Sequence, residues 1–107
     1  NAAGAFFETF VVSELVKNYY NAGINPEIFY YRDIDKKEID VVIQKGRDLY
    51  PIEIKKGKNP KNPGKNFSVL KSFETEYNIK PGLIVCLSDR LLPYSRDIWY
   101  CPVSLLN

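Results

Sequence analysis

The 107-residue sequence contains no histidine and no methionine, and it has only two cysteines and one tryptophan. The lack of histidine excludes zinc sites with imidazole ligands, Ser-His-Asp triads and imidazole acid–base catalysis. Any chemistry must therefore use carboxylates, lysines or bound metal ions. A natural chain starts with an encoded methionine, but no methionine precedes the first expected helix, which begins within a few residues of Asn1. We therefore expect these residues to form one domain of a longer protein.

Long apolar runs are also missing. No segment approaches the roughly 18–20 apolar residues that a membrane-spanning helix needs, and no signal peptide is visible. We therefore expect a cytoplasmic protein without membrane contact. Cys86 and Cys101 lie in apolar, strand-like segments, so two small buried thiols are favoured over a disulfide.

The remaining composition is that of an ordinary globular domain. Hydrophobic residues make up 45% and aromatic residues 14% of the chain, which excludes disordered and low-complexity classes. A chain of this length can bury a single core. With 15 basic and 13 acidic residues, the net charge of +2 does not by itself indicate a nucleic-acid-binding protein.

Hydrophobic periodicity and turn residues predict the order of the main elements. A helix is expected over residues 4–20, and a second one at about 67–77 with Asn66 as its N-cap. Strands are expected over residues 28–32, 38–44, 49–55 and 83–87, with a weaker terminal strand over 98–103. The order α-β-β-β-α-β predicts a single α/β domain over residues 1–107, with a mixed β-sheet flanked by helices.

The two central strands are predicted to form a hairpin with Gly46 and Arg47 at the two central positions of its turn. In this register Asp40 lies opposite Glu53, and Glu38 lies opposite Lys55. Because side chains alternate along a strand, these four polar residues share one face. The other face is uniformly aliphatic and is expected in the core: it consists of Ile39, Val41, Ile43, Ile52 and Ile54.

The pairing of Asp40 with Glu53 needs an explanation, because like charges that face each other destabilise a sheet. Two carboxylates about 5 Å apart repel by about 3 kcal/mol at an effective dielectric constant near 20. Solvent, a shared proton or a divalent cation can offset this repulsion. Carboxylate oxygens suit Mg²⁺ or Mn²⁺, and the Ile54 carbonyl between Glu53 and Lys55 can add a third oxygen.

Glu8 has an unusual position in the first predicted helix. It lies at helical spacing from Val11 and Leu15, so the pattern places a carboxylate in the apolar stripe that packs on the sheet. A buried charge needs a partner such as a lysine, a metal ion or a metal-bound water. The alternative interpretation of the hairpin is a solvated face with cross-strand salt bridges such as Glu38–Lys55. Three acids and a lysine that converge favour a functional site.

These residues resemble the PD-(D/E)xK nuclease superfamily, whose core has the order α-β-β-β-α-β, an acid on the second strand and Glu-x-Lys on the third. The matching segments are Glu38-Ile39-Asp40-Val41-Val42 and Pro51-Ile52-Glu53-Ile54-Lys55, and Glu8 in Gly4-Ala5-Phe6-Phe7-Glu8 matches an acid on the first helix. The resemblance implies a restriction-endonuclease-like fold.

More closely, the chain resembles a domain of unknown function found C-terminal to AAA-type ATPase modules in many bacterial and archaeal proteins. This resemblance rests on the segment from Phe7 to Leu15, on Tyr31-Arg32-Asp33 and on the two hairpin segments, and it covers nearly the whole chain. It implies that the chain is an excised C-terminal domain and that the ATPase domain of the same full-length chain is its partner.

The superfamily resemblance also implies a role for each site residue. Asp40 and Glu53 would bind Mg²⁺ or Mn²⁺, with the Ile54 carbonyl completing the site. Lys55 would orient or deprotonate the attacking water and stabilise charge on the phosphate of DNA. Glu8 would hold a second ion or a metal-bound water.

A lysine-rich loop follows the third predicted strand. Residues 55–65 hold five lysines and no acid. One interpretation is a mobile arm that binds the nucleic-acid backbone through Lys56, Lys58, Lys61 and Lys65. The other is a soluble loop with nothing to bind.

Three functions remain open from the sequence. The first is a metal-dependent nuclease-like domain that hydrolyses DNA phosphodiester bonds. The second is a non-catalytic module that binds nucleic acid or protein and regulates an N-terminal AAA-type ATPase. The third is a plain interaction domain whose acids form salt bridges.

Overall fold

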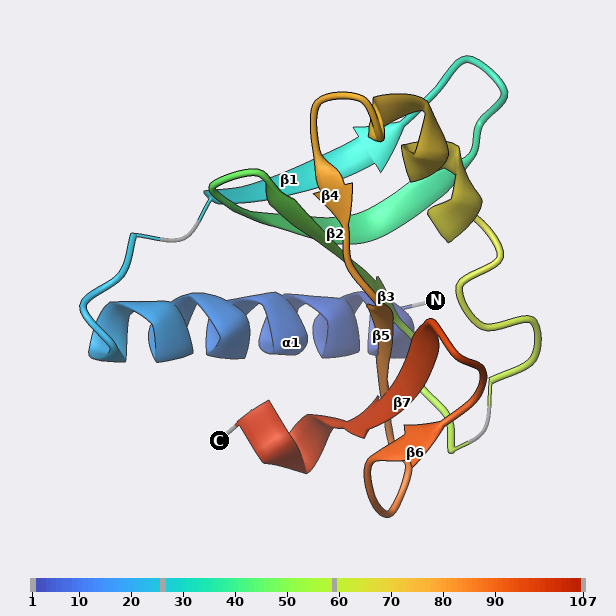
Figure 1. Cartoon of the computed structure of the whole chain (residues 1–107). Helices are drawn as coiled ribbons and strands as arrows, with labels where there is room; N and C mark the ends of the chain where they lie inside the picture. The colour runs from blue at the N-terminus through green and yellow to red at the C-terminus, as the bar shows by residue number, and fades with distance from the viewer. Residues whose placement is uncertain (1, 26, 59, 107) are drawn as a thin grey trace.

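The computed structural model of the chain describes residues 2–25, 27–58 and 60–106, and Figure 1 shows its elements. Asn59, in the lysine-rich loop, lies outside these residues. The elements are α1 (Ala2–Asn21), β1 (Glu27–Arg32), β2 (Glu38–Lys45), β3 (Asp48–Ile54), the 3₁₀-helix η1 (Phe67–Phe73), β4 (Asn78–Ile79), β5 (Gly82–Cys86), β6 (Leu92–Pro93), β7 (Ile98–Pro102) and the 3₁₀-helix η2 (Val103–Leu106).

The helix α1 forms where the apolar periodicity predicts it. Val11 and Leu15 are buried in the core, and the partly buried Phe7 and Tyr19 extend the same stripe. Gly23 follows the last turn with a left-handed φ of 74°, a conformation that glycine adopts without steric cost. Among the described residues, no helix combines the length and the apolar character that crossing a membrane requires.

The sheet is mixed, as predicted. It has seven strands in the order β1-β2-β3-β5-β7-β6, with β4 paired to the first residues of β3. β1, β2 and β3 are antiparallel, β3, β5 and β7 are parallel, and β6 runs antiparallel to β7. This arrangement confirms the α/β fold class. The two-residue strands β4 and β6 were not predicted, because two residues carry no periodicity.

The central hairpin has the predicted register from its turn as far as Val41 and Ile52, but the expected cross-strand pairs Asp40–Glu53 and Glu38–Lys55 lie beyond this point and are not among its backbone pairs. Val41 pairs with Ile52 and Lys45 pairs with Asp48, so Gly46 and Arg47 form the turn. Gly46 has a φ of 60°, which the tight turn requires and which glycine adopts readily.

A β-bulge in β2 corrects one part of the prediction. Phe29 pairs with Val42, but Tyr31 pairs with Ile39, so β2 holds one extra residue at this point. A bulge shifts the alternation of side chains along its strand. Ile39 therefore packs in the cluster of Val42, and not with Val41 as the simple alternation predicted.

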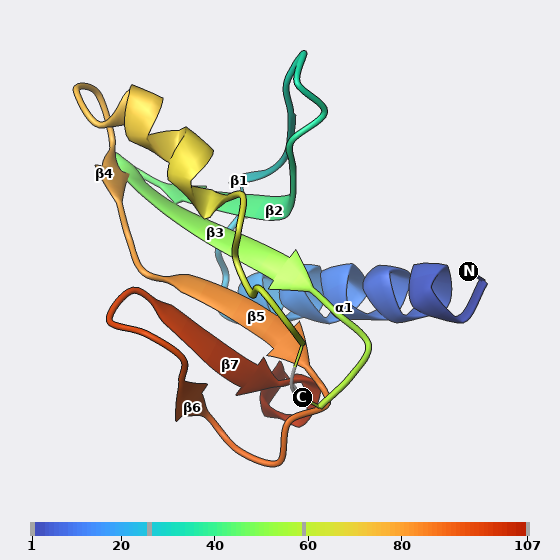
Figure 2. The same ribbon diagram turned by 90° about the vertical axis from the view of Figure 1, so that its right-hand side faces the viewer.

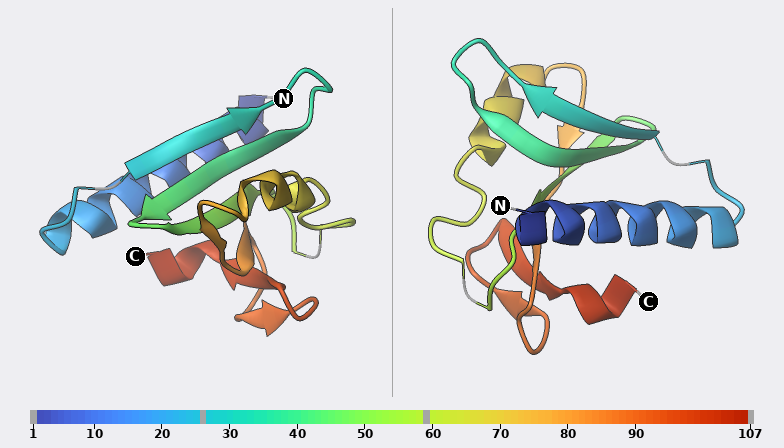
Figure 3. Two further views of the ribbon diagram at one scale, coloured as in Figure 1. Left: turned by 45° about the horizontal axis from the view of Figure 1, so that its top comes forward. Right: turned by 180° about the vertical axis from the view of Figure 1, so that it is seen from behind.

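Each face of the sheet carries its own apolar cluster, and Figure 2 shows α1 and η1 on opposite sides. The cluster under α1 joins Val11 and Leu15 to β-strand residues such as Val85 and Cys101. Figure 3 shows η2 beside α1, where the Asn18 side-chain amide donates a hydrogen bond to the Leu106 carbonyl. The cluster on the other face is smaller and consists of Ile39, Val42, Leu49 and Leu70, with partly buried neighbours.

The second helix is shorter and tighter than predicted. It is a 3₁₀-helix over Phe67–Phe73, and Asn66 makes no side-chain cap; its amide donates to the Glu38 carbonyl instead (3.0 Å). A 3₁₀-helix has three residues per turn, so Phe67, Leu70 and Phe73 recur on one stripe. Phe67 and Leu70 belong to the smaller cluster, and Phe73 packs edge-on against Tyr31.

Both cysteines are buried free thiols, as predicted. Cys86 lies at the end of β5 and Cys101 lies in β7. Burial raises the pKa of the Cys101 thiol, which keeps it protonated.

Candidate functional site

The strands β2 and β3 separate at one end, and Asp40 bridges the gap between them. The backbone pairing continues only as far as Val41 and Ile52. Beyond it, the Ile54 N–H donates a hydrogen bond to Oδ2 of Asp40 (2.8 Å) instead of to a β2 carbonyl. The next residue, Lys55, donates its N–H to Val85 on the other neighbouring strand (3.0 Å). Because the N–H and C=O of one strand residue point the same way, the Ile54 carbonyl also faces the gap.

Glu53 is held from the loop that follows β3. The Gly64 N–H donates a hydrogen bond to Oε2 of Glu53 (2.6 Å). Oε1 of Glu53 lies 3.8 Å from Nζ of Lys55, and the Glu53 side chain is only 16% exposed, against 53% for Lys55. The carboxylate is therefore fixed by a backbone donor, and the lysine reaches the same site from the solvent side.

These groups line one small pocket. Its volume is about 120 Å³, and it is lined by Glu38, Ile39, Asp40, Glu53, Lys55, Gly64, Lys65, Asn66 and Phe67. The structure thus brings together Asp40, Glu53 and Lys55, as the register of the hairpin predicts. Three carboxylates and two lysines line the pocket, so the acids outnumber the cations at a point where the strands leave space for solvent.

The ion pairs at this site agree in part with the alternative interpretation: Glu38 forms a cross-strand pair, but with Arg32 on β1, and the expected Glu38–Lys55 pair is not among the ion pairs of the described residues. Arg32 Nε lies 3.4 Å from Glu38 Oε1, and Lys55 pairs with Glu53 on its own strand. Both pairs are partly exposed, so each contributes little to the free energy of unfolding. Arg32 is thus next to a carboxylate of the pocket.

Glu8 on α1 is not part of the lining of this pocket and instead lines a separate hollow on the surface of α1. The N-terminal half of α1 runs beside the end of β3 (Figure 2), where the strands separate. The Glu8 side chain is exposed, so the prediction of a buried carboxylate is wrong. Partial desolvation, and then the carboxylates of Asp40 and Glu38, nevertheless raise the pKa of Glu8. The negative charges of Asp40 and Glu38 therefore act on Glu8, although Glu8 does not line the pocket. Its role as a ligand stays a prediction.

The oxygen atoms where β2 and β3 separate meet some of the requirements of a site for a hard divalent cation. Asp40 and Glu53 each use one carboxylate oxygen to accept a backbone hydrogen bond, and carboxylates with a neighbouring backbone carbonyl are ligands that Mg²⁺ and Mn²⁺ prefer. Within residues 2–25, 27–58 and 60–106, however, no three acidic or cysteine side chains come close enough to hold an ion together. Two carboxylates and the Ile54 carbonyl are thus the ligand set that this arrangement offers.

The lysine-rich loop is attached to the sheet at several points. The Gly57 carbonyl accepts a hydrogen bond from Leu87 N–H (2.7 Å), and the Pro60 carbonyl accepts one from the Tyr100 hydroxyl (3.1 Å). The described parts of the loop are therefore attached to the sheet at these two points, and the binding of nucleic acid by its lysines stays a prediction. Its exposed lysines are Lys56, Lys58, Lys61 and Lys65, of which Lys65 lines the carboxylate pocket.

Sequence reasoning missed several residues of the site. Gly64 and Phe67 join the pocket from the loop and from η1, and neither belongs to the acidic motif. Gly64 has a φ of 67°, and the Pro63-Gly64 pair is the only sequence signal that could have indicated a tight turn there. Glu38 was placed on the polar face but was not named as a site residue.

Comparison with known families shows to which family the chain belongs. The sequence profile of a domain of unknown function, DUF4143, matches residues 3–106. The chain belongs to this family. DUF4143 domains are found C-terminal to AAA-type ATPase modules, as the closer of the two sequence resemblances indicated. The family carries no assigned activity, so the wider likeness to PD-(D/E)xK nucleases stays a prediction. No curated protein matches the chain.

Proposed function

We propose that this domain hydrolyses phosphodiester bonds of DNA with the help of Mg²⁺ or Mn²⁺. The observation that supports the proposal best is the convergence of Asp40, Glu53 and Lys55 in one pocket where two strands separate. Two carboxylates beside a lysine provide a place for a cation and a place for a phosphate. The exposed lysines of the neighbouring loop supply contacts to the rest of the backbone.

Each residue has a task that its surroundings allow. Asp40 and Glu53 hold the ion with the Ile54 carbonyl, and the backbone donors on both carboxylates keep them in place. When bound there, such an ion would supply a lowered pKa of water and neutralisation of charge on the phosphate oxygens. Lys55 orients the attacking water and stabilises negative charge on the phosphate. Glu8, at the edge of the site, accepts a proton or holds a water.

The test uses plasmid DNA with Mg²⁺ or Mn²⁺ and the variants Asp40→Asn, Glu53→Gln and Lys55→Gln. Each variant keeps the size of its side chain and removes its charge, so we expect nicking to fall at least about 100-fold. Matched controls are Asp48→Asn and Lys45→Gln at the opposite end of the same hairpin, where we expect less than a twofold change. Nicking that survives in all three variants, or that is absent from the wild type with either ion, would refute the proposal.

A second candidate follows from a specific observation. No three of the described acids come close enough to hold one metal ion together, and Glu8 remains outside the pocket. This arrangement also suits a module that binds nucleic acid or protein and regulates an N-terminal AAA-type ATPase without cutting DNA. DNA binding that weakens with salt, together with no nicking and no Mn²⁺ binding by calorimetry, would favour this second function.

A further inference from the structure

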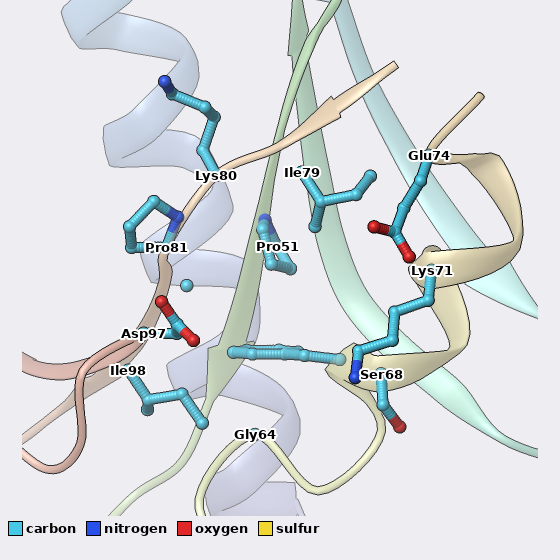
Figure 4. Close-up of a pocket in the computed structure, with 12 residues that line it drawn as sticks. Pro51, Gly64, Ser68, Lys71, Glu74, Ile79, Lys80, Pro81, Asp97 and Ile98 are labelled. Atoms are coloured by element: carbon cyan, nitrogen blue, oxygen red, sulfur yellow. The ribbon is translucent and has the colours of Figure 1, made fainter. Parts of the chain in front are cut away.

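A second and larger pocket lies directly beside the carboxylate pocket. Its volume is about 390 Å³, within the range of small-molecule sites. Figure 4 shows η1 on one side, with Ser68, Lys71 and Glu74, and the segments before β5 and β7 on the other, with Pro81 and Asp97. The carboxylate mechanism described above does not use this space.

The pocket exists because two prolines interrupt the sheet. Leu49 pairs with Ile79, but the next pairs join Ile52 to Leu83, so the edge beside β3 gains one residue between β4 and β5. Pro51 and Pro81 lie at this point, and neither has an N–H to continue the pairing. The space is therefore part of the folded sheet and does not have to be opened by a ligand.

One short segment separates the two pockets. Gly64 and Phe67 line both of them. The Gly64 N–H holds Glu53, and a Cβ atom at Gly64 would lie 2.8 Å from the Phe67 ring. A Cβ atom at Gly82 would overlap with the same ring, so two glycines leave the space that this aromatic side chain fills. A group bound in the larger pocket would thus be separated from the carboxylate pocket by the wall that Gly64 and Phe67 share.

The chemistry of the walls suits a flat heterocycle. Pro51 and Ile79 form an apolar floor in Figure 4, and Ile98 adds to the side wall. Polar groups lie at the rim: the Ser68 hydroxyl and the Lys71 ammonium group on η1, and the Asp97 carboxylate opposite them. Apolar faces with donors and acceptors at the edge match a nucleobase, which stacks through its faces and forms hydrogen bonds through its edge.

We propose that this pocket binds an unpaired nucleobase of the DNA strand whose phosphate enters the carboxylate pocket. The inference rests on the proposed function and specifies its substrate: a strand with an unpaired base next to the bond that is cut. A base inside a duplex is stacked and paired, and it can enter such a pocket only after it leaves the helix. Phe67 and Pro51 contact the face of the base, Asp97 accepts a hydrogen bond from an exocyclic amino group, and Lys71 pairs with a neighbouring phosphate.

The first experiment measures base binding without metal or cleavage. Deoxyadenosine monophosphate is titrated into the ¹⁵N-labelled domain in EDTA, with abasic deoxyribose 5-phosphate as the reference ligand. We expect saturable shifts at Gly64, Ser68, Gly82 and Asp97 for the nucleotide, and at least about fivefold weaker binding of the abasic compound, since one aromatic stack is lost. Equal shifts from both ligands, or none up to 20 mM nucleotide (about 20 times a millimolar Kd), would overturn the inference.

Two pairs of variants locate the effect. Ser68→Trp fills the pocket from an exposed position, whereas Ser72→Trp places the same side chain on η1 outside the pocket lining. We expect Ser68→Trp to abolish the shifts and Ser72→Trp to preserve them. Phe67→Leu should weaken nucleotide binding at least about fivefold, with Phe10→Leu on the exposed side of α1 as its control. Unchanged binding in Ser68→Trp would overturn the inference.

The second experiment separates this inference from the proposed function. With Mg²⁺, we expect a duplex with one bulged base to be cut at least tenfold faster than the fully paired duplex, and Ser68→Trp to remove the preference. Equal cutting of both duplexes would overturn the inference and leave the nuclease proposal standing. If neither is cut, the nuclease proposal fails, and the nucleotide titration alone decides whether the pocket binds a base.

Discussion

Gly64 connects the carboxylate pocket to the larger one, and its replacement by alanine tests the geometry of both. Gly64 has a φ of 67°, and a left-handed conformation costs a residue with a Cβ atom about 1–2 kcal/mol. The new methyl group would also lie 2.8 Å from Cδ2 of Phe67 and 2.9 Å from Cδ1 of Ile98. Overpacking of this kind typically costs about 1–3 kcal/mol. We therefore expect Gly64→Ala to lower the free energy of unfolding by about 2–5 kcal/mol.

Two other glycines separate the backbone cost from the packing cost. Gly46 has a φ of 60°, but no described atom lies within 4 Å of a Cβ placed there, so Gly46→Ala should cost only about 1–2 kcal/mol. Gly57 has no positive φ and equally open surroundings, so Gly57→Ala should stay within about 0.5 kcal/mol or stabilise the fold slightly. The expected order of stability is therefore Gly57→Ala, then Gly46→Ala, then Gly64→Ala.

Urea unfolding followed by far-UV circular dichroism measures these differences. At a slope of about 1.5 kcal/mol per molar urea, Gly64→Ala should lower the unfolding midpoint by roughly 1–3 M. If Gly64→Ala and Gly46→Ala unfold at the same urea concentration, Phe67 and Ile98 do not confine Gly64, and the reasoning about the shared wall of the two pockets is refuted.

Three further predictions address the acids and the loop. Asp40→Ala should lower the free energy of unfolding by about 1–3 kcal/mol because the Ile54 N–H loses its acceptor. Asp40→Asn should lower it less because the amide oxygen still accepts this hydrogen bond. Equal decreases for both variants in urea unfolding would contradict this. The raised pKa of Glu8 means that its ionised form destabilises the folded state, so this penalty is absent at low pH and appears as pH rises through the folded-state pKa. Glu8→Gln should therefore raise Tm at pH 8 in EDTA but not at pH 3. The gain in the free energy of unfolding should be well under 1 kcal/mol since the side chain is exposed, and a lower Tm at pH 8 would be inconsistent. The last prediction concerns the four exposed loop lysines, Lys56, Lys58, Lys61 and Lys65. Replacing all four by glutamine should weaken DNA binding and reduce the slope of log K against log salt by up to about 3. An unchanged slope in fluorescence anisotropy would favour the soluble-loop interpretation.

Local patterns were enough to predict the parts of the fold that depend on neighbours in the sequence. The turn at Gly46 and Arg47 determines the register of the hairpin, because a two-residue turn leaves one way to pair the strands. The register in turn brings Asp40, Glu53 and Lys55 to the same pocket. That these three side chains line one pocket could therefore be predicted from the sequence alone.

Other features depend on contacts that no local pattern contains. The bulge in β2 arises from pairing with β1, and it moves Ile39 to the opposite face from the one that alternation predicts. Glu8 lies at helical spacing from the buried Val11 and Leu15, but its own side chain is exposed in the structure. Periodicity indicates the direction in which a side chain points, whereas its depth depends on what the rest of the chain places above it.

What the sequence by itself determined is the order of the main elements, the hairpin and the two acids that share one pocket, because these follow from spacing and turn chemistry. What only the tertiary structure decided is how the site is enclosed. The Gly64 N–H on Glu53 joins residues 11 positions apart, and the wall shared by the two pockets needs Gly64, Phe67, Gly82 and Pro51 together. Such contacts depend on the path of loops and on close approach without a Cβ atom, and these form only when the whole chain is folded.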